Sequence, residues 1–95
     1  MKIGLQFAMT QELHALPGAK DLSPVETVSG VPFFQVAPDI LACAGGISKV
    51  NAAMATQLFI DLYHPDLILN VGVAGCFEDL PIGTLVLPDR FMQHD

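Results

Sequence analysis

One carboxylate in this sequence stands where it could act on water. Glu12 falls in the first turn of a short helix that is expected directly after an apolar strand. The partial positive charge at a helix start favours an ionised carboxylate, and an ionised carboxylate can accept a proton from water. A first-turn glutamate that only stabilises its own helix has the same pattern. Position alone therefore leaves both interpretations of Glu12 open.

Two glycine-rich segments follow apolar strands and suggest a binding crevice. They span residues 43–53 and 67–75, and each strand ends in glycines that let the backbone turn and approach a ligand closely. We expect the two strand ends to lie side by side in a parallel sheet, where open α/β sheets bind ligands. Gly45-Gly46 suits either an anion or a tight turn. Met9 and Ile47 at the crevice edge would face either an apolar substrate group or the core.

The order of the predicted elements indicates the fold class. Thr10 is the expected helix N-cap, Pro17-Gly18 ends that helix, and Ser29-Gly30 suits a hairpin turn. Strands are expected over 2–8, 25–28, 31–36, 40–44, 67–73 and 84–87, and a helix over 47–62 whose apolar face is Ile47, Val50, Met54, Leu58 and Leu62. This order predicts an α/β fold, a three-layer α-β-α sandwich with a mixed central sheet.

Composition excludes several partners. The net charge is −6 with only four Lys and Arg residues, so nucleic-acid binding is not expected. No apolar run is long enough to cross a membrane, and the N-terminus does not resemble a signal peptide. No Cys/His spacing indicates a metal site, and no cofactor is expected. Cys43 and Cys76 both read as buried thiols of a cytoplasmic protein rather than as a disulfide.

The chain is unusually apolar for its size. Hydrophobic residues make up 52% and charged residues 15% of the 95 residues, which favours packing against further protein from its own chain or from a partner. No packing helix or closing strand is expected over 90–95, where His94-Asp95 forms either a hydrogen-bonded pair or a polar tail. We therefore expect residues 1–95 to be the N-terminal part of a single, incomplete domain.

Four stretches together resemble one protein family. The sequence is similar to the N-terminal part of the nucleoside phosphorylase/nucleosidase family, and most similar to its bacterial 5′-methylthioadenosine/S-adenosylhomocysteine nucleosidases. The resemblance covers nearly the whole chain in the order and spacing of that family. The matching stretches are the start through Ala8-Met9-Thr10-Gln11-Glu12, then residues 46–53, residues 65–75, and residues 82–87 with His94-Asp95.

The resemblance implies hydrolysis of the bond between a purine and a 5′-substituted ribose, without a cofactor. It implies that Glu12 helps to activate the attacking water. Met9 and Ile47 match residues that line the pocket for the 5′-alkylthio group, and Ala8 belongs to the same substrate-binding set. The segment Val73-Ala74-Gly75 matches the strand end beside ribose and base. Subunits of this family pair around the active site, so the resemblance implies a homodimer or another homo-oligomer.

Three residues depart from the family pattern. Phe7 and Ser48 stand where the family usually has glycine, and Val73 stands where many nucleosidases have Ser or Thr. The general acid and the ribose-binding glutamate of the family belong to the second half of its domain, which these 95 residues do not include. We therefore expect the 95 residues alone to be inactive, and the missing hydroxyl at Val73 leaves the nucleoside substrate undetermined.

Three alternatives follow from the same residues. The stretch Asn70 to Phe77 also suits a futalosine-type hydrolase. A purine or uridine nucleoside phosphorylase needs cations for phosphate, and the absence of Arg and Lys from residues 4–12 favours water over phosphate. A truncated, non-catalytic module for binding or assembly would oligomerise through exposed sheet or helix faces and turn over no nucleoside.

Overall fold

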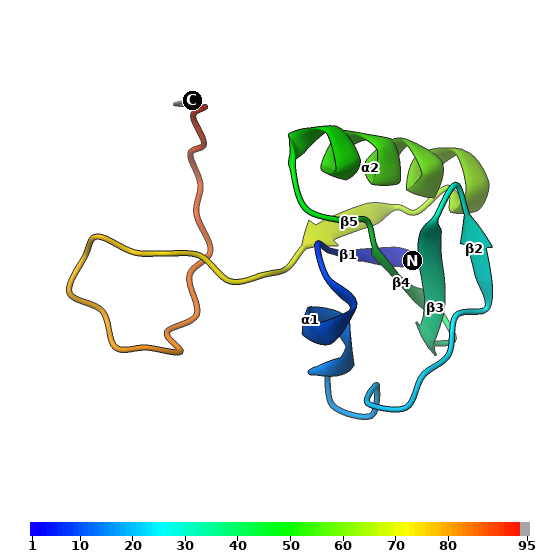
Figure 1. The fold of residues 1–95 in the computed structure, drawn as a ribbon, viewed down its shortest axis with the longest axis horizontal. Coiled ribbons are helices and arrows are strands. Elements are labelled where there is room, and N and C mark those ends of the chain that lie inside the picture. Colours follow the sequence, from blue (N-terminus) through cyan, green and yellow to red (C-terminus); the bar gives the residue numbers. More distant parts are fainter. Residues whose placement is uncertain (94–95) are drawn as a thin grey trace.

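A mixed five-stranded sheet forms the centre of the protein, which is described here by a computed structural model of residues 1–93 (Figure 1). The strand order is β2-β3-β4-β1-β5. The interior strand β1 pairs in parallel with β4 and with the edge strand β5, whereas β3 pairs antiparallel with β2 and β4. The strands are β1 (Ile3–Phe7), β2 (Glu26–Val28), β3 (Val31–Ala37), β4 (Ile40–Ala44) and β5 (Leu67–Asn70).

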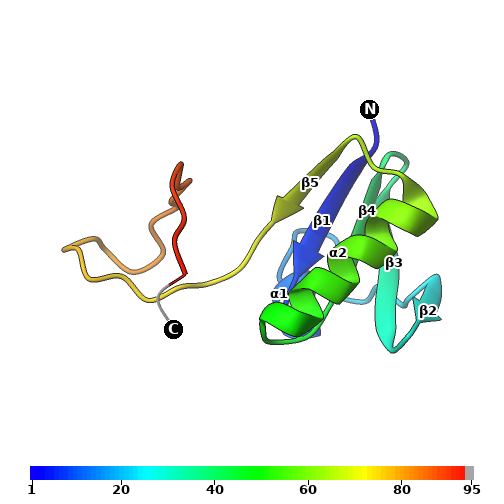
Figure 2. The ribbon, with the colours of Figure 1, turned by 90° about the horizontal axis from the view of Figure 1, so that it is seen from above.

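Two helices cover opposite faces of the sheet and complete three layers (Figures 1 and 2). The short helix α1 (Thr10–His14) packs through Leu13 against Phe7 and Phe34. The longer helix α2 (Lys49–Tyr63) packs through Ala55 and Phe59 against the other face. Neighbouring strand residues point to opposite faces, so Phe33 and Phe34 contribute to different core clusters. The predicted α-β-α sandwich with a mixed sheet is confirmed.

The hairpin between β2 and β3 forms as predicted. Its two-residue turn is Ser29-Gly30, with φ of 51° at Ser29 and 80° at Gly30. Positive φ at both turn positions matches the twist of the flanking strands, and glycine adopts it without steric cost. The hairpin places the β2-β3 edge far from the end of the sheet where β5 lies.

The face that α2 buries differs from the predicted one. The buried residues of α2 are Ala55 and Phe59, whereas Ile47 precedes the helix and is 68% exposed, and Val50 is 79% exposed. Two glycines explain the difference, because they let α2 approach the sheet at the positions of its buried residues. A Cβ at Gly4 would lie 2.9 Å from the ring of Phe59, and one at Gly45 would lie 2.5 Å from the Cβ of Ala55.

The segment after β5 leaves the sheet. Residues 71–93 contain no helix or strand, so the strand predicted over 84–87 is wrong and β5 ends at Asn70 rather than at residue 73. A strand needs a neighbour to hydrogen-bond with, and no described strand pairs with residues 84–87. Leu85 and Leu87 are 96% and 92% exposed. His94 and Asp95 lie outside the described residues.

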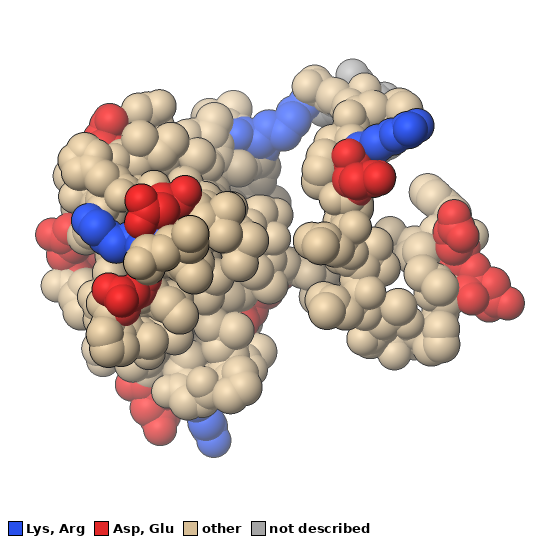
Figure 3. All heavy atoms as spheres, turned by 180° about the vertical axis from the view of Figure 1, so that it is seen from behind, with Lys and Arg blue, Asp and Glu red and all other residues tan. Residues whose placement is uncertain are grey.

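The arrangement of the chain determines where its charged side chains lie and which of its two thiols is exposed. On the face in Figure 3, Lys and Arg side chains lie apart from one another, and several of them lie beside Asp or Glu side chains. Neither α1 nor α2 is long and apolar enough to cross a membrane, and they are the helices of residues 1–93.

Cys43 is buried as predicted. Cys76 is exposed, contrary to the prediction, because it belongs to the segment that leaves the sheet.

Candidate active site

Three parallel strands end together at one edge of the sheet, and the candidate site lies there. Their last residues are Phe7 of β1, Ala44 of β4 and Asn70 of β5. The two glycine-rich strand ends are not adjacent, contrary to the prediction, because β1 pairs with both of their strands and separates them. The segment that follows β1, which carries Glu12, therefore begins between the two glycine-rich ends.

The glycine pair after β4 forms a tight turn fixed to the end of β1. Gly45 N–H donates to the carbonyl oxygen of Phe7, and Gly46 N–H donates to that of Ala8, both at 2.9 Å. These amides are therefore engaged with backbone oxygens, which favours the tight turn over the anion site. Gly46 has φ of 98°, a conformation that suits glycine. The turn fixes where Ile47 stands relative to the end of β1.

Ser48 begins α2 in a backbone conformation that glycine alone adopts easily. Its φ is 101° and its ψ is 160°. Its hydroxyl accepts a hydrogen bond from Asn51 N–H at 3.4 Å, and the Asn51 side-chain amide donates to the carbonyl oxygen of Ile47 at 2.7 Å. Local hydrogen bonds thus hold the connection between β4 and α2 in a strained shape next to the candidate site.

Glu12 connects its own helix to the segment after β5. Its Oε1 accepts from Met9 N–H at 3.0 Å and its Oε2 accepts from Val73 N–H at 3.3 Å. Met9, with extended φ and ψ of −127° and 146°, occupies the N-cap position, so Thr10 is the first helical residue and the prediction that it caps α1 is wrong. The half-buried Glu12 therefore accepts the N–H of the N-cap residue of α1 and also contacts the segment that follows β5, on the other side of β1.

The remaining predicted site residues follow the ends of the three parallel strands. Ala8 follows β1 and is exposed, and Met9 is partly buried. Ile47 follows β4 and is exposed; neither it nor Met9 belongs to a core cluster of the described chain. Val73, Ala74 and Gly75 are exposed after β5. Hydrogen bonds from the backbone N–H groups of Met9 and Val73 to the Glu12 carboxylate bring these three residues together. Ile47 follows β4 and lies across β1 from Val73.

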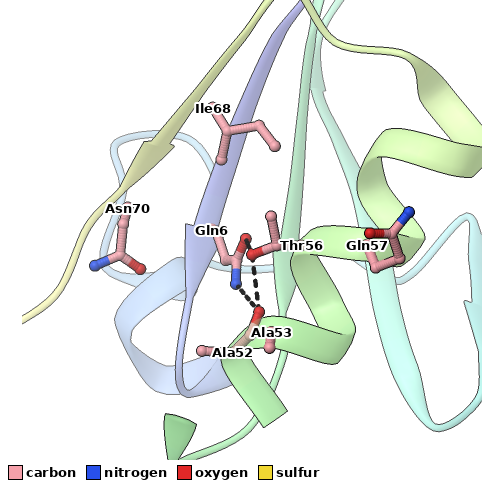
Figure 4. A pocket seen from close by; sticks show the side chains of 7 residues that line it. All are labelled: Gln6, Ala52, Ala53, Thr56, Gln57, Ile68 and Asn70. Carbon is pink, nitrogen blue, oxygen red and sulfur yellow. Dashed lines mark hydrogen bonds between the residues drawn. The ribbon is translucent and has the colours of Figure 1, made fainter. Parts of the chain in front are cut away.

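A groove of about 490 Å³ lies beside α2, away from Glu12 (Figure 4). Within it, Thr56 Oγ1 donates to Gln6 Oε1 at 2.9 Å, and Gln6 Nε2 donates to the carbonyl oxygen of Ala52 at 3.0 Å. The sequence interpretation missed this pair, although a glutamine inside an apolar strand was a signal for it. The groove is lined by Gln6, Ala52, Ala53, Thr56, Gln57, Ile68 and Asn70, none of them charged.

No group of three metal-ligating side chains comes together within residues 1–93. The ionisable side chain fixed at the ends of the parallel strands is Glu12, held through both carboxylate oxygens by backbone N–H groups. Such an arrangement suits a carboxylate that accepts a proton from water or that stabilises positive charge on a bound molecule. The exposed small residues after β5 leave space for such a molecule beside it.

Known nucleosidases are similar to this chain in sequence and in fold. The chain is 39% identical over its whole length to the 5′-methylthioadenosine/S-adenosylhomocysteine nucleosidases of Shewanella piezotolerans and Shewanella halifaxensis, and spans 43% of each. It superposes on the Colwellia psychrerythraea enzyme of that name, solved with adenine, with a TM-score of 0.71 and 35% identity. That match covers 83% of this chain and 34% of the solved one.

A second solved structure agrees with the first. The S-adenosylhomocysteine nucleosidase of Streptococcus pyogenes, solved with 5-methylthiotubericidin, matches with a TM-score of 0.69 and 26% identity over 83% of this chain and 35% of that one. The chain thus spans less than half the length of these relatives. Residues 2–95 match the family model described as the Phosphorylase superfamily, and the chain therefore belongs to that superfamily.

Proposed function

We propose that these residues are the N-terminal part of a single nucleosidase domain. The domain hydrolyses the N-glycosidic bond of a 5′-substituted purine ribonucleoside such as 5′-methylthioadenosine or S-adenosylhomocysteine. The observation that carries the proposal is the placement of Glu12, whose carboxylate is held between Met9 N–H and Val73 N–H at the ends of the parallel strands. The relatives that match over the whole chain are named for this activity.

In the proposed reaction, Glu12 acts on the attacking water. Water attacks the anomeric carbon of the ribose, the bond to the purine nitrogen breaks, and Glu12 takes a proton from the water. Because the sugar becomes cation-like as the bond breaks, a nearby carboxylate also stabilises the transition state. The departing purine needs a proton from a general acid, which the family resemblance assigns to the second half of the domain.

The remaining residues are proposed to bind the substrate. Ala8, Met9 and Ile47 provide apolar contacts at the ends of β1 and β4, suited to an alkylthio group. Val73, Ala74 and Gly75 lie along the segment that Glu12 contacts, and their short side chains leave the backbone open to the ribose and base. Val73 offers no hydroxyl to the substrate, so its contribution is the backbone and an apolar surface.

Complementation with a relative tests the proposal. The chain is produced with the part of the Shewanella piezotolerans nucleosidase that lies beyond the matched region, and adenine release from 5′-methylthioadenosine is measured. We expect release from the combination and none from either part alone. Glu12→Gln should lower the rate by about 10²- to 10⁴-fold, the usual contribution of a general base. Glu26→Gln, the same chemical change on the opposite edge strand β2, should leave it unchanged.

The same assay separates the alternatives. A phosphorylase would require inorganic phosphate for purine release, and a futalosine-type hydrolase would release base from futalosine rather than from 5′-methylthioadenosine. If every combination fails with every nucleoside, the proposed function is wrong and a binding or assembly module is favoured.

We also propose that the protein is a cytoplasmic homodimer. Support for assembly comes from the apolar side chains that α2 leaves exposed, among them Val50 and Met54. Support for the compartment comes from the free thiols of Cys43 and Cys76, which suit a reducing environment. Sedimentation velocity should give a dimer that Val50→Asp dissociates; a wild-type monomer at all concentrations would contradict the dimer.

A further inference from the structure

The contact between Glu12 and the segment after β5 depends on the absence of a side chain at residue 72. Val73 N–H donates to Glu12 Oε2 at 3.3 Å, and the preceding residue is Gly72. A Cβ atom at Gly72 would lie 3.2 Å from that same Oε2, and it would meet no other atom within 4 Å outside its chain neighbours. Glu12 is thus the group that a side chain at position 72 would displace.

The Glu12 carboxylate also stands in place of a backbone hydrogen-bond acceptor of the sheet. Val71 N–H donates to the carbonyl oxygen of Gln6 at 2.9 Å, which continues the pairing of β5 with β1. The next amide on the same side of the segment belongs to Val73. The carbonyl oxygen of Ala8, two residues beyond Gln6, accepts instead from Gly46 N–H. Glu12 Oε2 supplies the acceptor for Val73, so the side chain extends the β5 pairing beyond the end of β1.

We propose that Gly72 is a positioning residue: because it has no side chain, the Glu12 carboxylate bridges Met9 N–H and Val73 N–H. Two backbone donors, one on each oxygen, fix the plane of the carboxylate and therefore the directions of its free lone pairs. A general base must stand within hydrogen-bond reach of its proton, and displacements of about 0.5 Å already matter. The consequence for catalysis rests on the proposed function of Glu12, whereas the bridge itself does not.

Backbone conformation does not explain the glycine. The glycines with positive φ are Gly18, Gly30, Gly46 and Gly83, and Gly72 is not among them. Alanine at position 72 is therefore compatible with the backbone, and its effect arises from the contact with Glu12. At 3.3 Å, the bond from Val73 is already at the long end of the hydrogen-bond range, so a shift of a few tenths of an ångström away from the methyl group breaks it.

Amide spectra of this chain test the bridge directly. In the wild type we expect the amide proton shifts of Met9 and Val73 to change with pH as the Glu12 carboxyl ionises, and both changes to vanish in Glu12→Gln. Gly72→Ala should abolish the change at Val73 and keep it at Met9. Gly75→Ala is the matched control, because a Cβ there meets nothing within 4 Å, and it should keep both changes.

The Met9 signal separates displacement of the carboxylate from loss of structure, because it persists only while α1 is intact. A Val73 amide whose pH dependence survives in Gly72→Ala overturns the proposal. So does a wild-type Val73 amide that is indifferent to Glu12→Gln.

An activity measurement then tests the consequence. In the complemented enzyme, Gly72→Ala should lower kcat by about 10- to 100-fold, as small misplacements of a catalytic group do, with KM changed less than about twofold. If kcat stays unchanged although Val73 no longer donates to Glu12, the bridge does not serve catalysis. If the complemented wild type releases no adenine, the proposed function fails, and the amide spectra still decide whether Gly72 positions Glu12.

Discussion

The hydroxyl of Thr56 on α2 donates a 2.9 Å hydrogen bond to the side-chain oxygen of Gln6 on β1. Gln6 is only 5% exposed, so its polar atoms depend on partners within the protein. Its amide nitrogen donates in turn to the carbonyl oxygen of Ala52, one turn before Thr56. These bonds fix the position of α2 along β1, the strand that leads to Glu12.

Replacing Thr56 by valine keeps the shape of the side chain and removes the donor. We expect Thr56→Val to lower the free energy of unfolding by about 1 kcal/mol, because Gln6 Oε1 loses its partner in a groove that water can partly reach. Gln57→Ala removes an exposed hydrogen bond to Asp61 and should cost less than about 0.5 kcal/mol. Urea denaturation measures both, and equal effects would contradict the importance of the Gln6 contact.

Ala55 of α2 packs close to Gly45, the residue that follows β4. Gly45→Ala should destabilise the protein by about 1–3 kcal/mol, as overpacking of a core does, because the new Cβ would lie 2.5 Å from that of Ala55. Ala55→Gly in the same chain should recover part of this loss. A double-mutant cycle on unfolding free energies tests the pair, and additive effects of the two substitutions would show that they do not touch.

The conformation of Ser48 predicts a stabilising substitution. Ser48→Gly relieves backbone strain that costs about 1–3 kcal/mol and loses a cap hydrogen bond worth only a few tenths of a kcal/mol relative to glycine. We expect a net gain of about 1 kcal/mol in urea denaturation. Ser29→Gly is the control, because φ of 51° lies in the left-handed region that serine visits at lower cost. A larger gain at Ser29 would contradict the strain at Ser48.

The two thiols should differ in reactivity. Burial raises the pKa of the Cys43 thiol to about 12, whereas Cys76 is exposed. Because the thiolate is the reactive form, a disulfide reagent at neutral pH should modify Cys76 quickly. It should modify Cys43 only as fast as the protein opens. Cys76→Ser should remove the fast phase and Cys43→Ser the slow one. Two fast phases in the wild type would contradict the burial of Cys43.

The Cys43 thiol makes the free energy of unfolding depend on pH in the alkaline range. Its ordinary pKa is 9.0 and its folded pKa is about 12, so the unfolded chain releases this proton more easily than the folded one. The contribution of Cys43 to stability is therefore complete below pH 9 and decreases as the pH rises toward 12. Cys43→Ala should flatten this decrease between pH 9 and 11 in urea denaturation. An unchanged slope would assign the decrease to other groups.

The sequence predicted the element order well and the faces of α2 poorly. Apolar residues occur on more than one side of this helix, and periodicity marked the side of Val50 and Met54, both of which are exposed. The buried side is set by Ala55 and Phe59, which face Gly45 and Gly4 on the sheet. Only the assembled sheet determines which glycines leave room for a helix. The periodicity of the helix sequence alone therefore cannot predict which face is buried.

For the candidate site, the sequence predicted the location of Glu12 but not its bonds. An acidic residue after a buried strand was enough to place a carboxylate at the end of β1. Its contact with Val73 requires β5 to pair with β1, a contact between residues more than 60 positions apart. The strand predicted over 84–87 is wrong because an apolar run specifies a strand only where another strand is available to pair with it.

The position of β1 between two strands that come later in the sequence has a consequence for how the protein folds during synthesis. Ile3 leaves the ribosome well before its two partners, Ile40 on β4 and Leu67 on β5. Until then both edges of an apolar strand stay unpaired, open to chaperones and to other nascent chains. Contacts between such distant residues also form slowly. Synthesis rate and chaperone supply should therefore govern the yield of folded protein more strongly than substitutions in the β2-β3 hairpin, whose strands pair as soon as they are synthesised.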